Sequence, residues 1–370
     1  FVSHHWRRMF RVSLLLVLIG TIECRVKFTY SEFLDGSDLK TVSQTDFACP
    51  KGCMIFSATE NEKLAIFNKA NGNEVTNLKT LANYNNDKDK SFLYGWTLTA
   101  GTYTLMNKDG LSGAQFGLYV VSQGAPNYGQ FLRVADAFSS AQFSTTTGWM
   151  TIMTRGTGIR MVTLNSAGNT AMTPKVFATG YDATGLEDEC WPLYNASSVS
   201  HAQQSQIDVI GPIATIRFDG LPSLTAATVH VGGDVMTEAS DTPNSLTISS
   251  PGFHGCYHVS STTLYDYNLN TLNRRFRSDL DQGVNVHIRS KQWIAVDSDA
   301  LIITGLQDQP IKLMGEESYE QNFLVNKVDI QLAWQRTNKN SNFAVQMDAT
   351  KSAATSPLLV AFLSSIVLLL

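Results

Sequence analysis

Leu-Thr-Ala-Gly-Thr-Tyr-Thr-Leu, the run from Leu98 to Leu105, alternates apolar and polar side chains once it has passed Gly101. This period of two residues is the pattern of a strand that is buried on one face. Asn-Lys-Asp-Gly follows at residues 107–110 and is typical of a hairpin turn. Strand and turn together predict an antiparallel β-protein.

Similar short runs, rich in β-branched and aromatic residues, recur on both sides of this hairpin, and helical periodicity is nearly absent before residue 183. The sequence therefore predicts an all-β fold of two antiparallel β-sandwich modules in tandem. Module 1 is predicted over residues 25–183, a polar linker over 184–205 and module 2 over 206–335, with Val325 to Trp334 as a closing strand. Thr271 to Leu280, with three arginines, is predicted as a short helix or an exposed basic loop.

Composition narrows the class of protein. Charged residues make up 16% of the chain, hydrophobic residues 43%, and the formal net charge is −4. Nucleic acid is excluded as a partner, because the chain lacks the clustered Lys and Arg that phosphate binding requires. Low charge with many Thr, Ser, Gly and Asn residues suits an extracellular β-protein.

The two ends predict export and lipid attachment. Translation is predicted to begin at Met9, so residues 1–24 comprise upstream sequence and a secretory signal peptide. At the other end, residues 349–370 resemble the signal for a glycosylphosphatidylinositol (GPI) anchor, which is removed after cleavage at Asp348. A short membrane helix is the alternative reading of this tail. Residues 336–348 are predicted to form a stalk, on a protein at the outer face of the plasma membrane, in membrane rafts.

Four cysteines remain in the mature chain once the signal peptide is removed. In an oxidising compartment they imply two disulfides. Pro50 and Gly52 favour a tight turn that joins Cys49 to Cys53. This leaves Cys190 to pair with Cys256, closing a loop that stabilises the fold by roughly 4 kcal/mol in the chain-entropy model. A zinc site is the alternative, but the spacing is not that of paired Cys-x-x-Cys motifs.

Candidate sites of chemistry are few. Asn195, in Asn-Ala-Ser, is the predicted glycosylation site. His254 and His258 flank Cys256, and the acidic pairs Asp279 with Asp281 and Asp297 with Asp299 could flank a sugar in a hydrolase. A structural role is the better interpretation of each, because a disulfide would occupy the sulfur and turn carboxylates are commonly solvated. The sequence predicts no catalytic, cofactor-binding or metal-binding residue.

Two stretches carry a family resemblance. Phe-Ser-Thr-Thr-Thr-Gly-Trp-Met-Thr-Ile-Met-Thr (residues 143–154), preceded by Phe-Leu-Arg (131–133), and Ile-Ser-Ser-Pro-Gly-Phe (248–253) resemble the nematode family of secreted CUB-like-domain proteins. The resemblance implies CUB-like or jelly-roll-like β-sandwiches, a signal peptide, an anchor tail and a link to innate immune responses. The four-cysteine pattern and the acidic calcium cluster of ordinary CUB domains are not found, so no site residue is carried over.

Three classes of function are compatible with this layout. The first is a GPI-anchored, non-enzymatic binding protein, whose partner is an extracellular glycan, a microbial surface or a protein ligand. An extracellular hydrolase acting on glycans would instead require a deep pocket with convergent titratable groups. A structural surface-coat protein would self-associate and bind no other ligand.

Overall fold

The computed structural model shows an all-β protein with one α-helix among the residues it describes. These are residues 26–27, 31–39, 41–85, 95–114, 116–123, 132–135, 139–145, 149–154, 158–166, 173–178, 191–195, 205–211, 213–219, 224–232, 244–251, 253, 255, 271–338 and 341–352. Among them, no helix is long and apolar enough to cross a membrane.

Two sheets form an N-terminal sandwich. Sheet I has the strand order β1 (Val26–Lys27), β2 (Ser31–Asp35), β9 (Gly117–Ser122), β4 (Cys53–Phe56) and β7 (Trp96–Leu98). Sheet II has the order β3 (Gln44–Cys49), β8 (Gly101–Asn107), β5 (Leu64–Asn68) and β6 (Glu74–Asn77). A 3-10 helix, η1 (Gly36–Leu39), and the helix α2 (Leu78–Asn85), which the strand pattern did not predict, complete this part.

The predicted strand and turn are confirmed in this sandwich, but they do not form a hairpin: β8 pairs with β3 and β5, whereas the next strand, β9, belongs to sheet I. Along β8, Tyr103 and Leu105 are buried while their neighbours are more exposed. Gly110 donates its N–H to the carbonyl of Asn107 at 2.9 Å and has a φ of 70°, a conformation that glycine adopts without strain. Alternation therefore directs one face of β8 into the core between the sheets.

The remaining strands form two further sheets. Sheet III has the order β10 (Leu132–Ala135), β12 (Trp149–Thr154), β17 (Ile213–Asp219), β14 (Thr173–Phe177) and β15 (Tyr194–Asn195). Sheet IV has the order β11 (Ser139–Thr145), β18 (Leu224–Gly232), β13 (Ile159–Ser166), β16 (Ser205–Val209), β19 (Ser245–Ser249), β24 (Asn342–Lys351), β20 (Thr271–Trp293), β23 (Glu316–Gln335), β21 (Ala300–Thr304) and β22 (Ile311–Leu313). Two pairs, β10 with β12 and β16 with β19, are parallel; the others are antiparallel.

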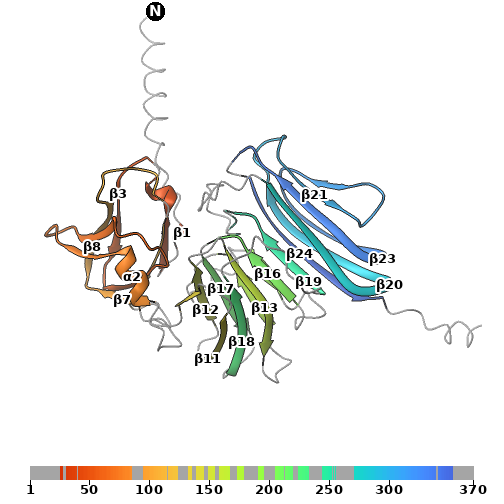
Figure 1. Ribbon diagram of the computed structural model, residues 1–370, viewed down its shortest axis with the longest axis horizontal. Helices are drawn as coiled ribbons and strands as arrows, with labels where there is room; N and C mark the ends of the chain where they lie inside the picture. The colour runs from red at the N-terminus through yellow and green to blue at the C-terminus, as the bar shows by residue number, and fades with distance from the viewer. Residues whose placement is uncertain are drawn as a thin grey trace, which may run out of the picture.

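The strand pairs do not agree with the predicted division into two modules joined by a linker at residues 184–205. Strands before residue 184 pair with strands after residue 205: β12 and β14 both pair with β17, and β13 pairs with β16 and β18. The N-terminal sandwich is thus complete by β9, and Figure 1 shows it (red and orange) beside the later strands. Which strands pair in a sheet depends on contacts between residues far apart in the sequence. A polar segment alone therefore does not locate a boundary between modules.

The sheets are stacked through shared hydrophobic contacts. Phe33, Phe56 and Tyr119 on the outer face of sheet I pack with Met153 of β12 and Ile213 of β17. Sheet I therefore lies between sheets II and III. On the side of sheet IV, the Tyr194 hydroxyl of β15 lies 3.1 Å from Ser205 Oγ of β16, and burial raises the pKa of Tyr194 to about 12.

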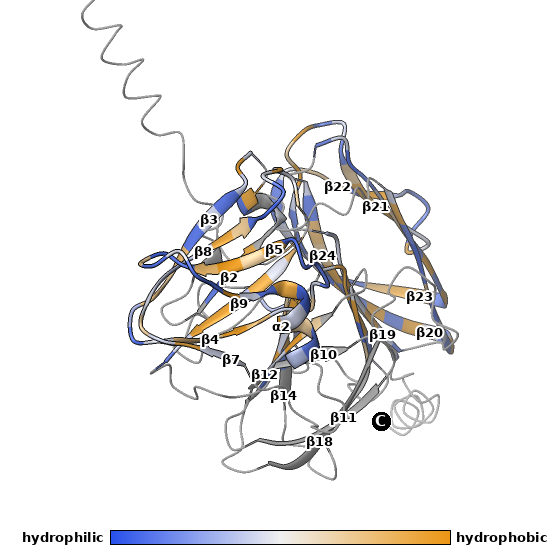
Figure 2. Ribbon diagram, turned by 60° about the vertical axis from the view of Figure 1, so that its left-hand side comes forward, coloured by the Kyte–Doolittle hydropathy of each residue, from blue (hydrophilic) through white to orange (hydrophobic). Residues whose placement is uncertain are grey.

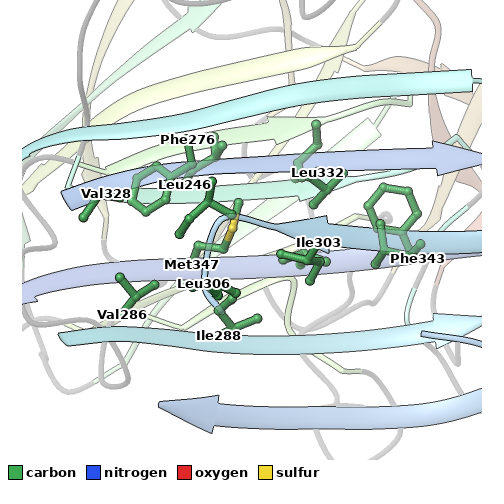
Figure 3. Close-up of a cluster of buried hydrophobic side chains, with 14 of the residues drawn as sticks. Leu246, Phe276, Val286, Ile288, Ile303, Leu306, Val328, Leu332, Phe343 and Met347 are labelled. Atoms are coloured by element: carbon green, nitrogen blue, oxygen red, sulfur yellow. The ribbon is translucent and has the colours of Figure 1, made fainter. Parts of the chain in front are cut away.

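The largest core lies on one face of the C-terminal part of sheet IV (Figure 3). It combines Leu246 of β19, Met347 of β24, Ile288 of β20, Leu332 of β23 and Ile303 of β21. Because β19 and β21 are separated by three strands in the sheet yet contribute to one cluster, the sheet curls around this core. The 23-residue strand β20 is the longest part of that curl.

Two predicted segments are corrected by this part of the sheet. Thr271 to Leu280 is neither a helix nor a loop but the first half of β20, in which Leu272, Arg274 and Phe276 are buried and the intervening residues exposed. Figure 2 shows hydrophilic and hydrophobic residues interspersed along β20 and β23. Most of the predicted stalk, residues 336–348, belongs to β24, which is paired with β19 on one side and β20 on the other. Its polar residues misled the prediction because several of them are buried within the stacked sheets.

A buried carboxylate fixes the turn between β23 and β24. Asp299 accepts hydrogen bonds from the N–H groups of Thr337 (2.6 Å) and Asn338 (3.2 Å), and from the hydroxyls of Thr337 and Ser341. Burial alone would raise the pKa of Asp299, but these hydrogen bonds outweigh it and lower the pKa below its usual value. The carboxylate therefore ties the loop before β21 to the loop that leads into β24.

We predict that Asp299→Asn lowers the free energy of unfolding by about 2 to 3 kcal/mol at neutral pH, because its amide nitrogen faces donors instead of accepting from them. Urea unfolding measures the change. Since the folded-state pKa is depressed, the contribution is present above the unfolded pKa of about 3.9 and is lost as pH falls through the folded pKa, so the two proteins should converge in acid. Asp297→Asn, at an exposed position two residues away, is the matched control. An equal loss in both variants would contradict this role for Asp299.

Candidate interaction surface

The strand β23 is unusual in being exposed on both faces over its first third. From Glu316 to Asn322 every residue is exposed except the half-buried Tyr319, and Phe323 is the first buried residue. A strand of this kind is held by backbone pairing to its neighbour, because its side chains bury little apolar surface. Its partner is β20, which it follows from Glu316↔Trp293 to Gln335↔Thr271.

One edge of β23 has no partner over most of its length. β21 pairs with β23 only from Thr304↔Gln331 to Ala300↔Gln335, while β20 occupies the opposite side throughout. Among the described strands, none pairs with the outer side of residues 316–327, which we call the open edge. Such an edge presents unpaired backbone N–H and C=O groups, which can bind another strand.

The open edge carries charges near both ends and an apolar centre. Glu316, Glu317 and Glu320 lie toward its start and Lys327 at its end, all exposed. Leu324, between them, is 69% exposed. The distinguishing feature of this surface is therefore its unpaired backbone, and Leu324 adds one apolar side chain among exposed polar groups.

On one face, the edge adjoins side chains of β20. The imidazole of His287 lies 3.0 Å from the Glu320 carboxylate, and in register His287 stands between Asn322 of β23 and Asp348 of β24. Glu320 itself stands opposite Arg289. Glu320 is thus held against the neighbouring strand.

Arg289 joins this face to the segment before β15. Its guanidinium donates to the carbonyl of Pro192 (3.0 Å) and to Gln346 Oε1 (2.8 Å), and lies 4.3 Å from the centroid of the Trp191 ring. Burial lowers the pKa of Arg289 to about 10, although the charge of Glu320 opposes the shift. The group therefore stays charged at neutral pH and holds Trp191 against sheet IV.

The opposite face of the open edge is apolar. Tyr319 and Val325 are half-buried and pack against the large core, next to the buried Phe323. The Tyr319 hydroxyl donates to Gln321 Oε1 at 2.7 Å, and partial burial raises its pKa. The core of sheet IV is consequently only partly covered where it reaches the edge.

The structure places the predicted disulfide and modification residues as follows. Cys49 and Cys53 form a disulfide with their Cα atoms 5.3 Å apart, across a turn in which Gly52 has a φ of 88°; that prediction is confirmed. Cys190 and Cys256 lie outside the described residues, and their pairing stays a prediction. Their described neighbours Trp191 and Gly255 are hydrogen-bonded at 2.7 Å.

The other predicted positions do not converge on a site. Asn195 lies in β15 with its backbone opposite Lys175, and its glycosylation stays a prediction. Asp348 is 3% exposed in the middle of β24. His254 and His258 lie outside the described residues. Asp299 accepts hydrogen bonds from the turn between β23 and β24, and Asp297, two residues before it, is exposed. Asp281 stands opposite Lys327 in the register of β20 and β23. Among the described residues, no group of three or more His, Cys, Asp or Glu side chains could hold a metal ion.

Comparison with known proteins identifies no family. No family model and no curated protein matches the chain. Among solved structures, the chain is similar to the CUB1-EGF-CUB2 domains of rat MASP-1, with 11% identity, 59% of this chain and 100% of that chain covered, and a TM-score of 0.20. It is also similar to a structure of infectious bursal disease virus, Gx strain, with 9% identity, 90% and 74% covered and a TM-score of 0.15. Scores this low do not establish a shared fold or a shared function.

We predict that Arg289→Lys lowers the free energy of unfolding by about 1 to 2 kcal/mol, because an ammonium group loses the planar stacking on Trp191 and one of the two directed hydrogen bonds. Chemical denaturation measures the change. Arg277→Lys is the control: this side chain is half-exposed and its nearest carboxylate, that of Asp329, is 4.0 Å away. It should alter stability by less than about 0.5 kcal/mol. Equal effects of the two substitutions would argue against a role for Arg289 in holding the Trp191 segment.

Proposed function

We propose that this chain is a GPI-anchored binding protein of the cell surface, and that it binds a protein partner along the open edge of β23. The observation that carries the proposal is the combination of unpaired backbone with exposed charges and Leu324 over residues 316–327. Strand addition to such an edge uses backbone hydrogen bonds for affinity and the alternate side chains for specificity.

The rigidity of the surroundings supports this role. From Val284 to Trp293, the part beside most of the open edge, β20 is paired on both sides, with β24 and with β23. Arg275 of β20 also makes a bidentate contact with Asp329, with distances of 2.6 and 2.5 Å. A partner strand would therefore meet a backbone that is already held in its extended form, which reduces the ordering cost of association.

The fold also bears on where the proposed anchor is attached. Asp348 is buried, Ala349 is part of the core, and β24 remains paired with β20 as far as Lys351. The N–H of Ser352 then donates to the carbonyl of Gly283 at 2.8 Å. Attachment at Asp348 would remove these contacts, so we place it at Ser352, where Ser-Ala-Ala offers three small residues in a row. The polar spacer that remains is shorter than the usual length of about 8 to 12 residues.

We predict that a phosphatidylinositol-specific phospholipase C releases the protein from intact cells, and that the mature chain ends at Ser352. Mass spectrometry of the C-terminal peptide measures the end point. A chain that ends at Asp348 would keep the anchor and refute its placement. A membrane-bound chain that still contains Leu370 would refute the anchor itself.

Binding is tested with a soluble chain that ends at Ser352, screened on arrays of extracellular proteins, extended peptides and glycans. Gln321→Pro and Asn322→Pro are compared with the unchanged chain. Adjacent strand residues point their N–H groups to opposite sides, so one substitution removes a donor from the open edge and the other breaks pairing with β20. The variant that loses an N–H on the open edge should keep the stability of the unchanged chain, because its pairing with β20 is intact. We expect this variant to lose binding of protein or peptide ligands. A glycan ligand that survives both substitutions would contradict the proposed surface.

A further inference from the structure

We infer that the partner of the open edge is a second copy of this chain, bound antiparallel about a two-fold axis at Asn322. The inference rests on the proposed function, because it identifies the partner of the surface described above. It follows from the order of side chains along residues 316–327, which is complementary to itself when reversed.

Charge fixes the ends of this pairing. With Asn322 opposite its own copy, Glu317 of each chain stands opposite Lys327 of the other, so two intermolecular ion pairs form. Both residues are exposed in the single chain, and neither has its charge buried in the fold. Opposite charges in directly facing positions stabilise an antiparallel pair, whereas like charges in those positions destabilise it.

The apolar face is complementary in the same register. Tyr319 stands opposite Val325, and Phe323 opposite Gln321, with the two Phe323 rings in diagonal positions across the axis. Diagonal neighbours in a sheet are within reach of aromatic side chains. Tyr319 and Val325 are the residues at which the large core is only partly covered, so pairing would extend that core from one chain into the other.

Other registers are less favourable. An axis at Gln321 or Phe323 would place Lys327 opposite Gly315 or Tyr319, so the two ion pairs would not form. An axis at Glu320 would place that carboxylate opposite its own copy. An axis at Leu324 would place Glu317 opposite Gln331, whose outer side already pairs with Thr304 of β21. The axis at Asn322 avoids both conflicts and uses the whole of the open edge.

Charge reversal tests the register directly. Glu317→Lys and Lys327→Glu should each weaken the dimer roughly tenfold or more, because each turns two ion pairs into two like-charge pairs. An equimolar mixture of these two variants should dimerise again, since every facing position then carries opposite charges. Glu316→Lys is the matched control: Glu316 stands opposite Val328, so this variant should dimerise like the unchanged chain, and every mixed dimer that it forms with Lys327→Glu should keep one like-charge pair and be weaker than the dimer of Glu317→Lys with Lys327→Glu. Sedimentation velocity of the soluble chain ending at Ser352, over a range of concentrations, measures association.

Cross-linking gives a second measurement that does not depend on charge. Asn322→Cys should form an intermolecular disulfide on mild oxidation, because facing residues lie about 4.5–5.5 Å apart. Leu324→Cys should not, since the two sulfurs would be displaced by four residues, roughly 13 Å along the strands.

A chain that is monomeric at every concentration would overturn the inference, as would a dimer that is unaffected by both Glu317→Lys and Lys327→Glu. If such a monomer still binds an extended peptide in the proline-sensitive manner described above, the proposed function stands and only the identity of the partner is wrong. If it binds nothing at the edge, both fail.

Discussion

Backbone hydrogen bonding is the constraint on which the C-terminal half depends. Peptide groups buried between stacked sheets must be paired, and β20 meets this requirement with β24 on one side and β23 on the other. Both neighbours flank it from Val284 to Trp293, and β23 continues beside its first part, around the large core. β23 meets the requirement on both sides only from Gln331 to Gln335, where β21 joins it. The outer side of residues 316–327 can stay unpaired because most of these residues are exposed.

The local pattern of apolar and polar residues was sufficient to predict the fold class and the strands whose side chains alternate regularly. β8 and its turn at Asn107 to Gly110 follow from side-chain order alone, and Cys49 pairs with Cys53 because Pro50 and Gly52 close the turn between them. Alternation failed where buried positions are polar. Arg274 occupies a core-facing position of β20 between Leu272 and Phe276, and three arginines therefore concealed a strand. The same applies to Gln346 and Asp348 of β24, which read as a stalk.

The candidate surface lay beyond sequence reasoning for a different reason. Val325 to Trp334 was predicted as a strand, but β23 begins at Glu316, in a stretch whose charges gave no strand signal. The sequence of residues 316–327 does not indicate that one edge of the strand is unpaired. Whether an edge is paired depends on where the other strands of the sheet lie. The same limit explains the misplaced module boundary. The partners of β12 and β13 lie after residue 205, and no local signal specifies them.

Charges along an exposed strand are commonly a protection against aggregation, and the open edge must be reconciled with that role. Glu316, Glu317 and Glu320 would repel a strand that brings acidic side chains opposite them, including an in-register parallel copy of the edge itself. They do not repel a reversed copy centred at Asn322, because Lys327 then meets Glu317 and the other two acids face uncharged residues. Protection and recognition can therefore reside in the same side chains: the charges disfavour registers in which acidic residues face one another and favour the one that places Lys327 opposite Glu317. The proposed anchor would confine copies of the chain to a membrane surface and raise their effective concentration, so that even weak edge pairing would be populated.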